Sequence, residues 1–137
     1  MRESTARPGR VILADKHFNT LGAVRNLLET EAATVLMVAD ESSLWAALEN
    51  FKPDVVVADL SLPFSRGTNV ARSLKDRHPA VKVIILSIHD EKTVLDAVMA
   101  TGVEGFVLKR RAVIDLIPAM REILQGRIFI SQDVQGR

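Results

Sequence analysis

The stretch VVVADLSLP, residues 55–63, decides the fold, because an uninterrupted apolar run ends there at Asp59 and a polar turn follows. The same pattern recurs as VILAD at residues 11–15 and as VIILS at residues 83–87. Apolar runs without polar alternation are typical of strands that are buried on both faces of a parallel sheet. We therefore interpret these segments as buried strands that each end on a polar residue.

Helical patterns separate the apolar runs along the whole chain. Apolar residues at helical spacing predict five helices, near residues 19–31, 42–51, 68–78, 91–100 and up to 125. Strand runs alternate with them, at residues 11–14, 34–38, 55–58, 83–86 and 105–108. Strict alternation of strand and helix predicts an α/β fold, a doubly wound five-stranded parallel sheet of the flavodoxin-like (βα)5 type.

Local signals predict where the helices begin. Asp40 or Ser42 is expected to cap the second helix, and Thr68 the third. Pro118 lies inside the last helical pattern, where proline removes a backbone hydrogen bond and clashes with the preceding turn. That helix therefore either begins late, with Pro118 in its first turn and Asp115 near its cap, or is kinked at Pro118, and we favour the late start.

Composition excludes several classes of function. The 137 residues suffice for one domain, and 18 basic against 17 acidic residues exclude a strongly basic nucleic-acid-binding surface over the whole chain. The absence of cysteine excludes disulfide frameworks and thiol nucleophiles. The apolar runs are too short to cross a membrane, and residues 1–9, which we interpret as a flexible tail, lack the apolar segment of a secretory signal. We expect a cytoplasmic protein without membrane contact.

Polar side chains follow four of the predicted strands, namely Asp15, Asp59, Ser87 and Lys109. Ligands of open parallel α/β sheets bind at the carboxyl ends of the strands, so these side chains should meet there. A carboxylate can attack phosphorus, and a hydroxyl and an ammonium can stabilise phosphoryl oxygens. The sequence therefore predicts phosphoryl or metal chemistry at this edge, although a single aspartate at a strand end is more often only a turn residue.

These segments, together with GVEGFVLK at residues 102–109, resemble the receiver domain of two-component response regulators. The resemblance implies that Asp59 accepts a phosphoryl group from a sensor histidine kinase. It makes Ser87 the switch hydroxyl, Lys109 the phosphate-pairing lysine and Phe106 the aromatic switch residue, with plain core packing as the alternative for Phe106. Such a domain is no enzyme beyond its own phosphorylation and dephosphorylation at Asp59.

The resemblance also implies a magnesium site. Asp15, Asp59 and the backbone carbonyl of Ser61 would hold Mg²⁺. Lys16 departs from the family, which keeps a second acidic residue at this position as a direct metal ligand. Mg²⁺ depends on oxygen ligands and negative charge, so we expect weak binding here. Lys16 could pair with Asp59, or its long stem could extend into solvent.

A finer resemblance is to receivers of NarL/LuxR-type transcription regulators. It rests on LSIHD at residues 86–90, GFVLK at residues 105–109 and LQGRIFIS at residues 124–131. It implies a receiver at residues 10–126, a linker stub at 127–137, and DNA binding only through a C-terminal domain absent from this chain. A homodimer is expected, either through the first and last helices or through the fourth and fifth units.

Two other functions stay open at this stage. Lys16 favours an atypical pseudo-receiver, which would act as a phosphorylation-independent interaction or dimerisation module. An unrelated flavodoxin-like enzyme has less support, because no glycine-rich phosphate loop follows the first strand. A metal cluster of His17, His78 and His89 has no support from HxH or HExxH spacing.

Overall fold

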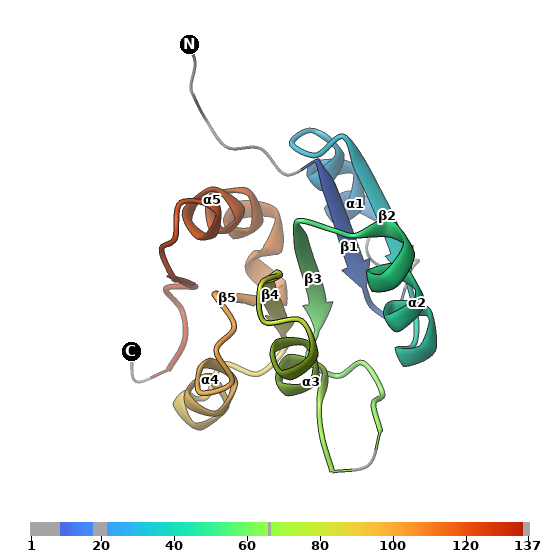
Figure 1. Cartoon of the computed structure of the whole chain (residues 1–137). Coiled ribbons are helices and arrows are strands. Elements are labelled where there is room, and N and C mark those ends of the chain that lie inside the picture. Colours follow the sequence, from blue (N-terminus) through green and yellow to red (C-terminus); the bar gives the residue numbers. More distant parts are fainter. Residues whose placement is uncertain (1–8, 18–21, 66, 136–137) are drawn as a thin grey trace.

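The structure is a computed structural model that describes residues 9–17, 22–65 and 67–135. Within them the strands form one parallel sheet in the order β2-β1-β3-β4-β5-β6 (Figure 1). The strands are β1 (Arg10–Ala14), β2 (Thr34–Val38), β3 (Val55–Asp59), β4 (Lys82–Ser87), β5 (Gly105–Leu108) and β6 (Phe129–Ile130). The expected tail at residues 1–9 lies outside the described residues except for Gly9.

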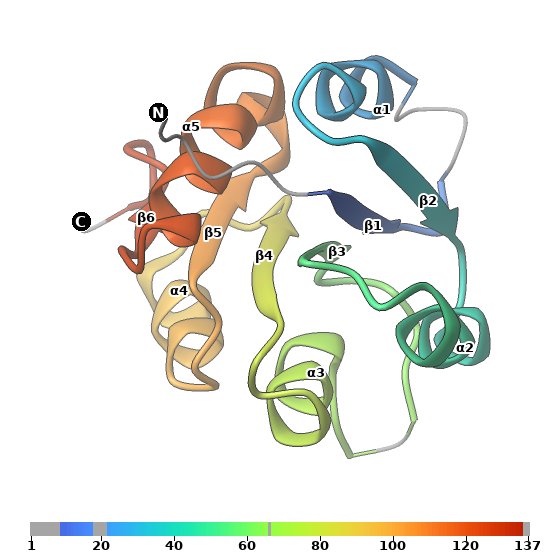
Figure 2. The same ribbon diagram turned by 45° about the horizontal axis from the view of Figure 1, so that its top comes forward.

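Helices cover both faces of the sheet, as Figure 2 shows. One face carries α1 (Gly22–Glu29) and α5 (Ala112–Leu124), and the other carries α2 (Glu41–Phe51), α3 (Val70–Arg77) and α4 (Lys92–Met99). Successive strand residues point to opposite faces, so Ile12 packs with the second group of helices and Leu13 with the first. This two-sided burial is the physical reason for the uninterrupted apolar runs.

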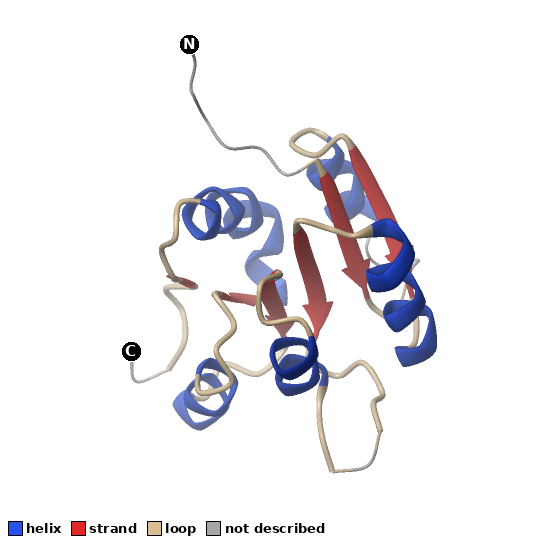
Figure 3. Cartoon of the chain, in the orientation of Figure 1, coloured by secondary structure: helices blue, strands red, loops and turns tan. Residues whose placement is uncertain are grey.

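The predicted doubly wound, flavodoxin-like parallel sheet is confirmed, and β6 extends it by one short strand (Figure 3). Phe129 and Ile130 pair in parallel with Gly105 and Phe106. Val134, a little further along, is 4% exposed and belongs to the hydrophobic core. The sequence pattern does not predict β6, because two residues are too few to show a strand periodicity.

The helix caps follow the predictions in part. Asp40 caps α2 by accepting a 2.8 Å hydrogen bond from the Ser43 N–H. The prediction of Thr68 for α3 was wrong by one residue, since Asn69 is the cap and accepts a 3.0 Å hydrogen bond from the Arg72 N–H. The predicted start of the first helix falls partly on residues 18–21, outside the described residues.

The predicted late start of the last helix was wrong. A 3₁₀ turn at Lys109–Arg111 leads directly into α5, so Pro118 lies inside the helix and Asp115 in its first turn. Pro118 and Ile114, whose carbonyl loses its helical partner, both lie on the exposed side of α5. Water can therefore satisfy that carbonyl, and Arg111 supports the first turn through Asp115.

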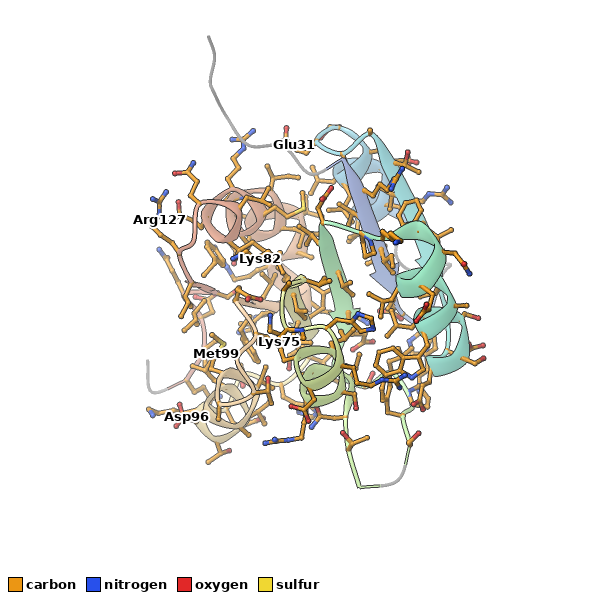
Figure 4. The ribbon with its side chains drawn as sticks, in the orientation of Figure 1. Glu31, Lys75, Lys82, Asp96, Met99 and Arg127 are labelled. Atoms are coloured by element: carbon orange, nitrogen blue, oxygen red, sulfur yellow. The ribbon has the colours of Figure 1, made fainter. Side chains whose placement is uncertain are left out.

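A partly buried ion pair ties α3 to the segment before β5. Lys75 of α3, labelled in Figure 4, places its Nζ 2.9 Å from Glu104 Oε2 and donates to the carbonyls of Pro79 and Val81. Glu104 Oε1 in turn accepts a 2.9 Å hydrogen bond from the Val83 N–H of β4. These bonds help fix β4 and β5, whose ends carry Ser87 and Lys109.

Candidate functional site

Two carboxylates and one ammonium meet at the carboxyl ends of β1, β3 and β5. Lys109 Nζ lies 2.8 Å from Asp59 Oδ2 and 2.9 Å from Asp15 Oδ2. The Asp15 side chain is fully buried, and that of Asp59 is 3% exposed. Three residues from distant parts of the chain thus form one compact ionic group, as the strand-end pattern predicts.

Backbone contacts hold this group in place. Asp59 is the last residue of β3, and its Oδ1 accepts a 3.1 Å hydrogen bond from the Ser61 N–H. Asp15 directly follows β1, and its own N–H donates to the Val38 carbonyl of β2. Lys109 opens the 3₁₀ turn after β5. Since β1 lies beside β3, the sheet order itself brings Asp15 next to Asp59.

The ionic group sets the protonation of its members. Burial raises the pKa of Asp59, but hydrogen bonds from the Lys109 ammonium and the Ser61 N–H outweigh it, so this pKa lies below its usual value. Burial lowers the pKa of Lys109, but the carboxylates of Asp59 and Asp15 outweigh it and raise this pKa above its usual value. At neutral pH Asp59 is therefore a carboxylate and Lys109 a cation.

Ser87 lies beside this group, at the end of β4. Its side chain is buried, and its Oγ both donates to the His89 carbonyl and accepts from the His89 N–H, each at 2.9 Å. A cavity of about 200 Å³ adjoins it and is lined by Asp59, Leu60, Ser61, Ser87, Ile88 and His89. The hydroxyl is thus engaged by its own loop, next to space that borders the Asp59 carboxylate.

Phe106 and Lys16 have contrasting environments. Phe106 is fully buried in β5, in the core that includes α4. Lys16 is exposed, and in the described part of the chain it makes no ion pair with Asp15 or Asp59. The hypothesis that Lys16 pairs with Asp59 was therefore wrong, because Lys109 holds that position. With Lys16 outside, the two carboxylates face one lysine and the group keeps a negative charge.

His17 is a site residue that sequence reasoning set aside, because it was considered only as part of a histidine cluster without HxH or HExxH spacing. Its N–H donates a 2.7 Å hydrogen bond to Asp15 Oδ1, and its Nδ1 lies 3.6 Å from the same oxygen. Asp15, His17 and Asp59 each offer one ligand atom within 4.8 Å of the others. The signal was the position of His17 two residues after a strand-end aspartate, where this turn brings its ring to the carboxylate.

The donor atoms fit a divalent cation. Asp15 Oδ2 is buried and forms an ion pair with the Lys109 ammonium 2.9 Å away, and it accepts no further hydrogen bond from the described residues. A carboxylate oxygen has more than one lone pair, so Oδ2 can serve as a ligand beside this ion pair. Asp59 supplies a second carboxylate, and hard oxygen ligands are those that Mg²⁺ prefers.

Comparison with known proteins identifies the relatives of this chain. The response regulator receiver domain family matches residues 11–121. The transcriptional regulatory protein DegU of Brevibacillus brevis is 32% identical over 127 residues, which cover 91% of this chain and 54% of DegU. Response regulator GacA of Pseudomonas viridiflava is 30% identical over 91% of this chain and 59% of GacA. The chain therefore spans little more than half the length of these relatives.

Solved structures show the same architecture. The isolated REC domain of RcsB from Salmonella enterica serovar Typhimurium, in the presence of phosphomimetic BeF₃⁻, matches with a TM-score of 0.82 and 28% identity, covering 91% of this chain and 94% of that one. A LuxR-family regulator from an Aurantimonas species matches with a TM-score of 0.82 and 27% identity, over 94% and 93% of the two chains.

Among the described helices, none is long and apolar enough to cross a membrane.

Proposed function

The chain belongs to the response regulator receiver domain family, and from this premise we propose that it is a phosphorylation-switched receiver with Asp59 as the phosphoacceptor. Receiver domains of this kind are in general signalling modules and not enzymes. The observation that carries the proposal is the contact of Lys109 with both Asp59 and Asp15, at 2.8 and 2.9 Å, beside the cavity that Ser87 adjoins.

The geometry supports a direct phosphoryl transfer. An Asp59 oxygen attacks the phosphorus of a phosphohistidine in a sensor kinase, the new O–P bond forms, and the P–N bond breaks. The leaving imidazole nitrogen keeps the electron pair of that bond and takes up a proton from water. The low pKa of Asp59 keeps the nucleophile ionised. Lys109, already bound to Asp59, is close enough to pair with the added phosphoryl oxygens.

A divalent cation would be held by Asp15, Asp59 and the Ser61 carbonyl. Its chemistry is to neutralise charge on the phosphoryl oxygens. Because Lys16 replaces the second acidic residue, we propose that Mg²⁺ binds weakly. The exposure of Lys16 leaves no observation that favours the pseudo-receiver, since its ammonium does not fill the site in the described structure.

Ser87 is proposed as the switch hydroxyl. Before phosphorylation its Oγ is bonded to His89 within the loop after β4. A phosphoryl group on Asp59 offers the hydroxyl a charged acceptor, and reorientation of Ser87 would break its bond to the His89 carbonyl. The loop before α4 would then shift its population, with Phe106 as the aromatic partner of the switch.

The proposed context is that of the relatives. A histidine kinase in the cytoplasm would donate the phosphoryl group, and DNA would be bound through a C-terminal domain beyond this chain. One RcsB structure of the comparison, with a TM-score of 0.81 and 28% identity over 91% of this chain and 65% of that one, holds two RcsB dimers bound to two parallel DNAs. We propose a homodimer here, through the first and last helices or through the fourth and fifth strand–helix units. The receiver would begin at residue 10, but the expected boundary to a linker at residues 127–137 lies too early, because β6 and Val134 pack with the sheet and the core.

Treatment with a small-molecule phosphodonor tests the proposal. Intact mass measurement of the full chain, with a divalent cation present, should show one phosphoryl adduct that is lost in Asp59→Asn. The matched control is Asp54→Asn. Asp54 lies outside the site, and its carboxylate accepts hydrogen bonds from the Gly9 and Arg10 N–H groups. This variant should keep the adduct. Failure of the wild-type chain to form an adduct, or an adduct that persists in Asp59→Asn, would contradict the proposal.

A further inference from the structure

We propose that residues 131–135, which we call the C-terminal strap, are attached to the domain under the control of the loop after β4, so that this loop holds or releases the far end of the strap. The inference rests on the proposed function only for the event that moves the loop, the phosphorylation of Asp59. The coupling between loop and strap is a property of the unmodified chain and is measurable there.

The near end of the strap is fixed to β5 and α5. The Ser131 N–H donates a 3.0 Å hydrogen bond to the Phe106 carbonyl. The Ser131 Oγ donates to Asp115 Oδ2 at 2.7 Å and accepts from the Leu108 N–H at 3.1 Å. Ser131 is fully buried. Its three partners lie outside the loop after β4, so we expect this end to stay in place when the loop moves.

The far end of the strap is held by the loop itself. The Gln135 N–H donates a 2.7 Å hydrogen bond to the Asp90 carbonyl, and the side chain of Val134 is 4% exposed and packs in the hydrophobic core. The two residues between the ends, Gln132 and Asp133, are exposed. A movement of the far end can therefore be taken up there without displacing the near end.

The loop is in turn held by the proposed switch hydroxyl. The Oγ of Ser87 donates to the His89 carbonyl and accepts from the His89 N–H, each at 2.9 Å, and Asp90 is the next residue. The position of the Asp90 carbonyl thus depends on these two bonds. A Ser87 hydroxyl that turned toward a phosphoryl group would release His89, and the acceptor of the far end would no longer be fixed.

Arg110 joins the same two parts from the side of Lys109, its neighbour in the chain. Its Nη2 lies 3.3 Å from Asp90 Oδ2 and 3.4 Å from the Asp133 carbonyl. The Arg110 side chain is half-exposed and both contacts are long, so they guide the strap more than they hold it. The Gln135 bond and the burial of Val134 therefore remain the main attachment of the far end.

Hydrogen exchange of backbone amides, followed by NMR on the full unphosphorylated chain, tests the coupling. Ser87→Ala removes the hydroxyl and both of its bonds to His89. The Gln135 N–H should exchange about tenfold faster than in wild type, because its acceptor is no longer held in place. The Ser131 N–H should change by less than about twofold, whereas a general loss of stability would accelerate it as well.

Ser73→Ala is the matched control, because it removes a serine hydroxyl on α3 that bonds to Thr68 Oγ1 at 2.9 Å, away from the loop and the strap. It should leave the exchange rate of the Gln135 N–H within about twofold of wild type. An unchanged Gln135 rate in Ser87→Ala, or equal acceleration of the Gln135 and Ser131 amides, would overturn the inference.

A sample treated with a small-molecule phosphodonor separates the inference from the proposed function. Where intact mass shows the Asp59 adduct, the Gln135 N–H should exchange faster, as in Ser87→Ala. An adduct that leaves the Gln135 rate unchanged would overturn the inference while the proposed function stands. Absence of the adduct would contradict the proposed function alone, because the comparison of Ser87→Ala with wild type decides the coupling without a phosphoryl group.

Discussion

Asp115 is a buried charge that lies apart from the candidate site. Its carboxylate accepts hydrogen bonds from Arg111 Nε at 2.9 Å and from Ser131 Oγ at 2.7 Å, and Ser131 Oγ accepts a bond from the Leu108 N–H. Burial raises the pKa of Asp115, but the bonds from Arg111 and Ser131 outweigh it and hold the pKa below its usual value. The ionised form is therefore the one that stabilises the fold.

Asp115→Asn should lower the free energy of unfolding by about 1–3 kcal/mol at neutral pH, because charge-assisted hydrogen bonds are lost. A carboxyl group whose pKa is lower in the folded than in the unfolded state contributes its full stabilisation of the fold above the unfolded pKa of about 4. This contribution disappears as the pH falls through the folded pKa. The difference in the free energy of unfolding between wild type and Asp115→Asn, measured by urea unfolding, should thus stay constant from about pH 7 to pH 5 and narrow below about pH 4.

The control is Glu122→Gln, which removes the charge from the exposed pair with Arg127 and should leave the free energy of unfolding close to that of wild type. A gap between wild type and Asp115→Asn that persists undiminished to pH 3 would mean that the charge of Asp115 is not what stabilises the fold.

Residue positions could be predicted where the sheet alone determines them. Asp15, Asp59, Ser87 and Lys109 gather at one edge because parallel strands end there, and the sequence pattern was sufficient to find them. The orientation of Lys16 and the approach of His17 depend on the turn that Asp15 Oδ1 forms with the His17 N–H. Such a turn is a local choice among several, and no apolar periodicity specifies it.

At the scale of the elements, the contact between β4 and β5 depends on a glycine. Gly105 of β5 is paired with Ile84 of β4, and a Cβ added at Gly105 would lie 2.9 Å from Ile84 Cγ1. Ile84 is fully buried, so it has little room to move. Gly105→Ala should lower the free energy of unfolding by about 1–3 kcal/mol in urea titrations, through overpacking.

Gly22→Ala is the matched control, because an added Cβ at this first residue of α1 meets no atom within 4 Å. It should be neutral or stabilise by up to about 1 kcal/mol, since alanine restricts the unfolded chain. Equal effects of the two substitutions would show that backbone entropy, and not packing against Ile84, sets the cost at Gly105.

Element boundaries were less predictable than element types. Every predicted strand and helix that falls on described residues is present, because burial on a sheet or helix face leaves a strong apolar period. The predicted start of α5 was wrong, because the expectation that proline is excluded from a helix interior does not hold where that position is exposed and the preceding turn is supported. Pro118 lies on the exposed side, and the Arg111–Asp115 pair supports the turn before it.

At the scale of the whole molecule, the C-terminal segment is part of the folded core. Val134 is 4% exposed and packs with the core, and the Gln135 N–H donates a 2.7 Å hydrogen bond to the Asp90 carbonyl in the loop before α4. Val134→Ala should therefore lower the free energy of unfolding by about 1–3 kcal/mol.

Val113→Ala makes the same chemical change on α5 where the side chain is 63% exposed, and it should stay within about 0.5 kcal/mol of wild type. Denaturant unfolding of both variants measures the difference. If Val134→Ala were as mild as Val113→Ala, residues beyond β6 would contribute little to the stability of the domain.

The sheet order also has a consequence for how the chain folds. After β1, β2 and β3 have assembled, each later strand joins the outer edge of its predecessor, β4 on β3, β5 on β4 and β6 on β5. The pairing of β1 with β3 is the exception, because it must form across the intervening β2 and its helices. Closing that long loop costs entropy before any neighbouring contact compensates for it. During synthesis on the ribosome, we expect β4, β5 and β6 each to pair with a strand that is already in place, once β1 and β3 have paired.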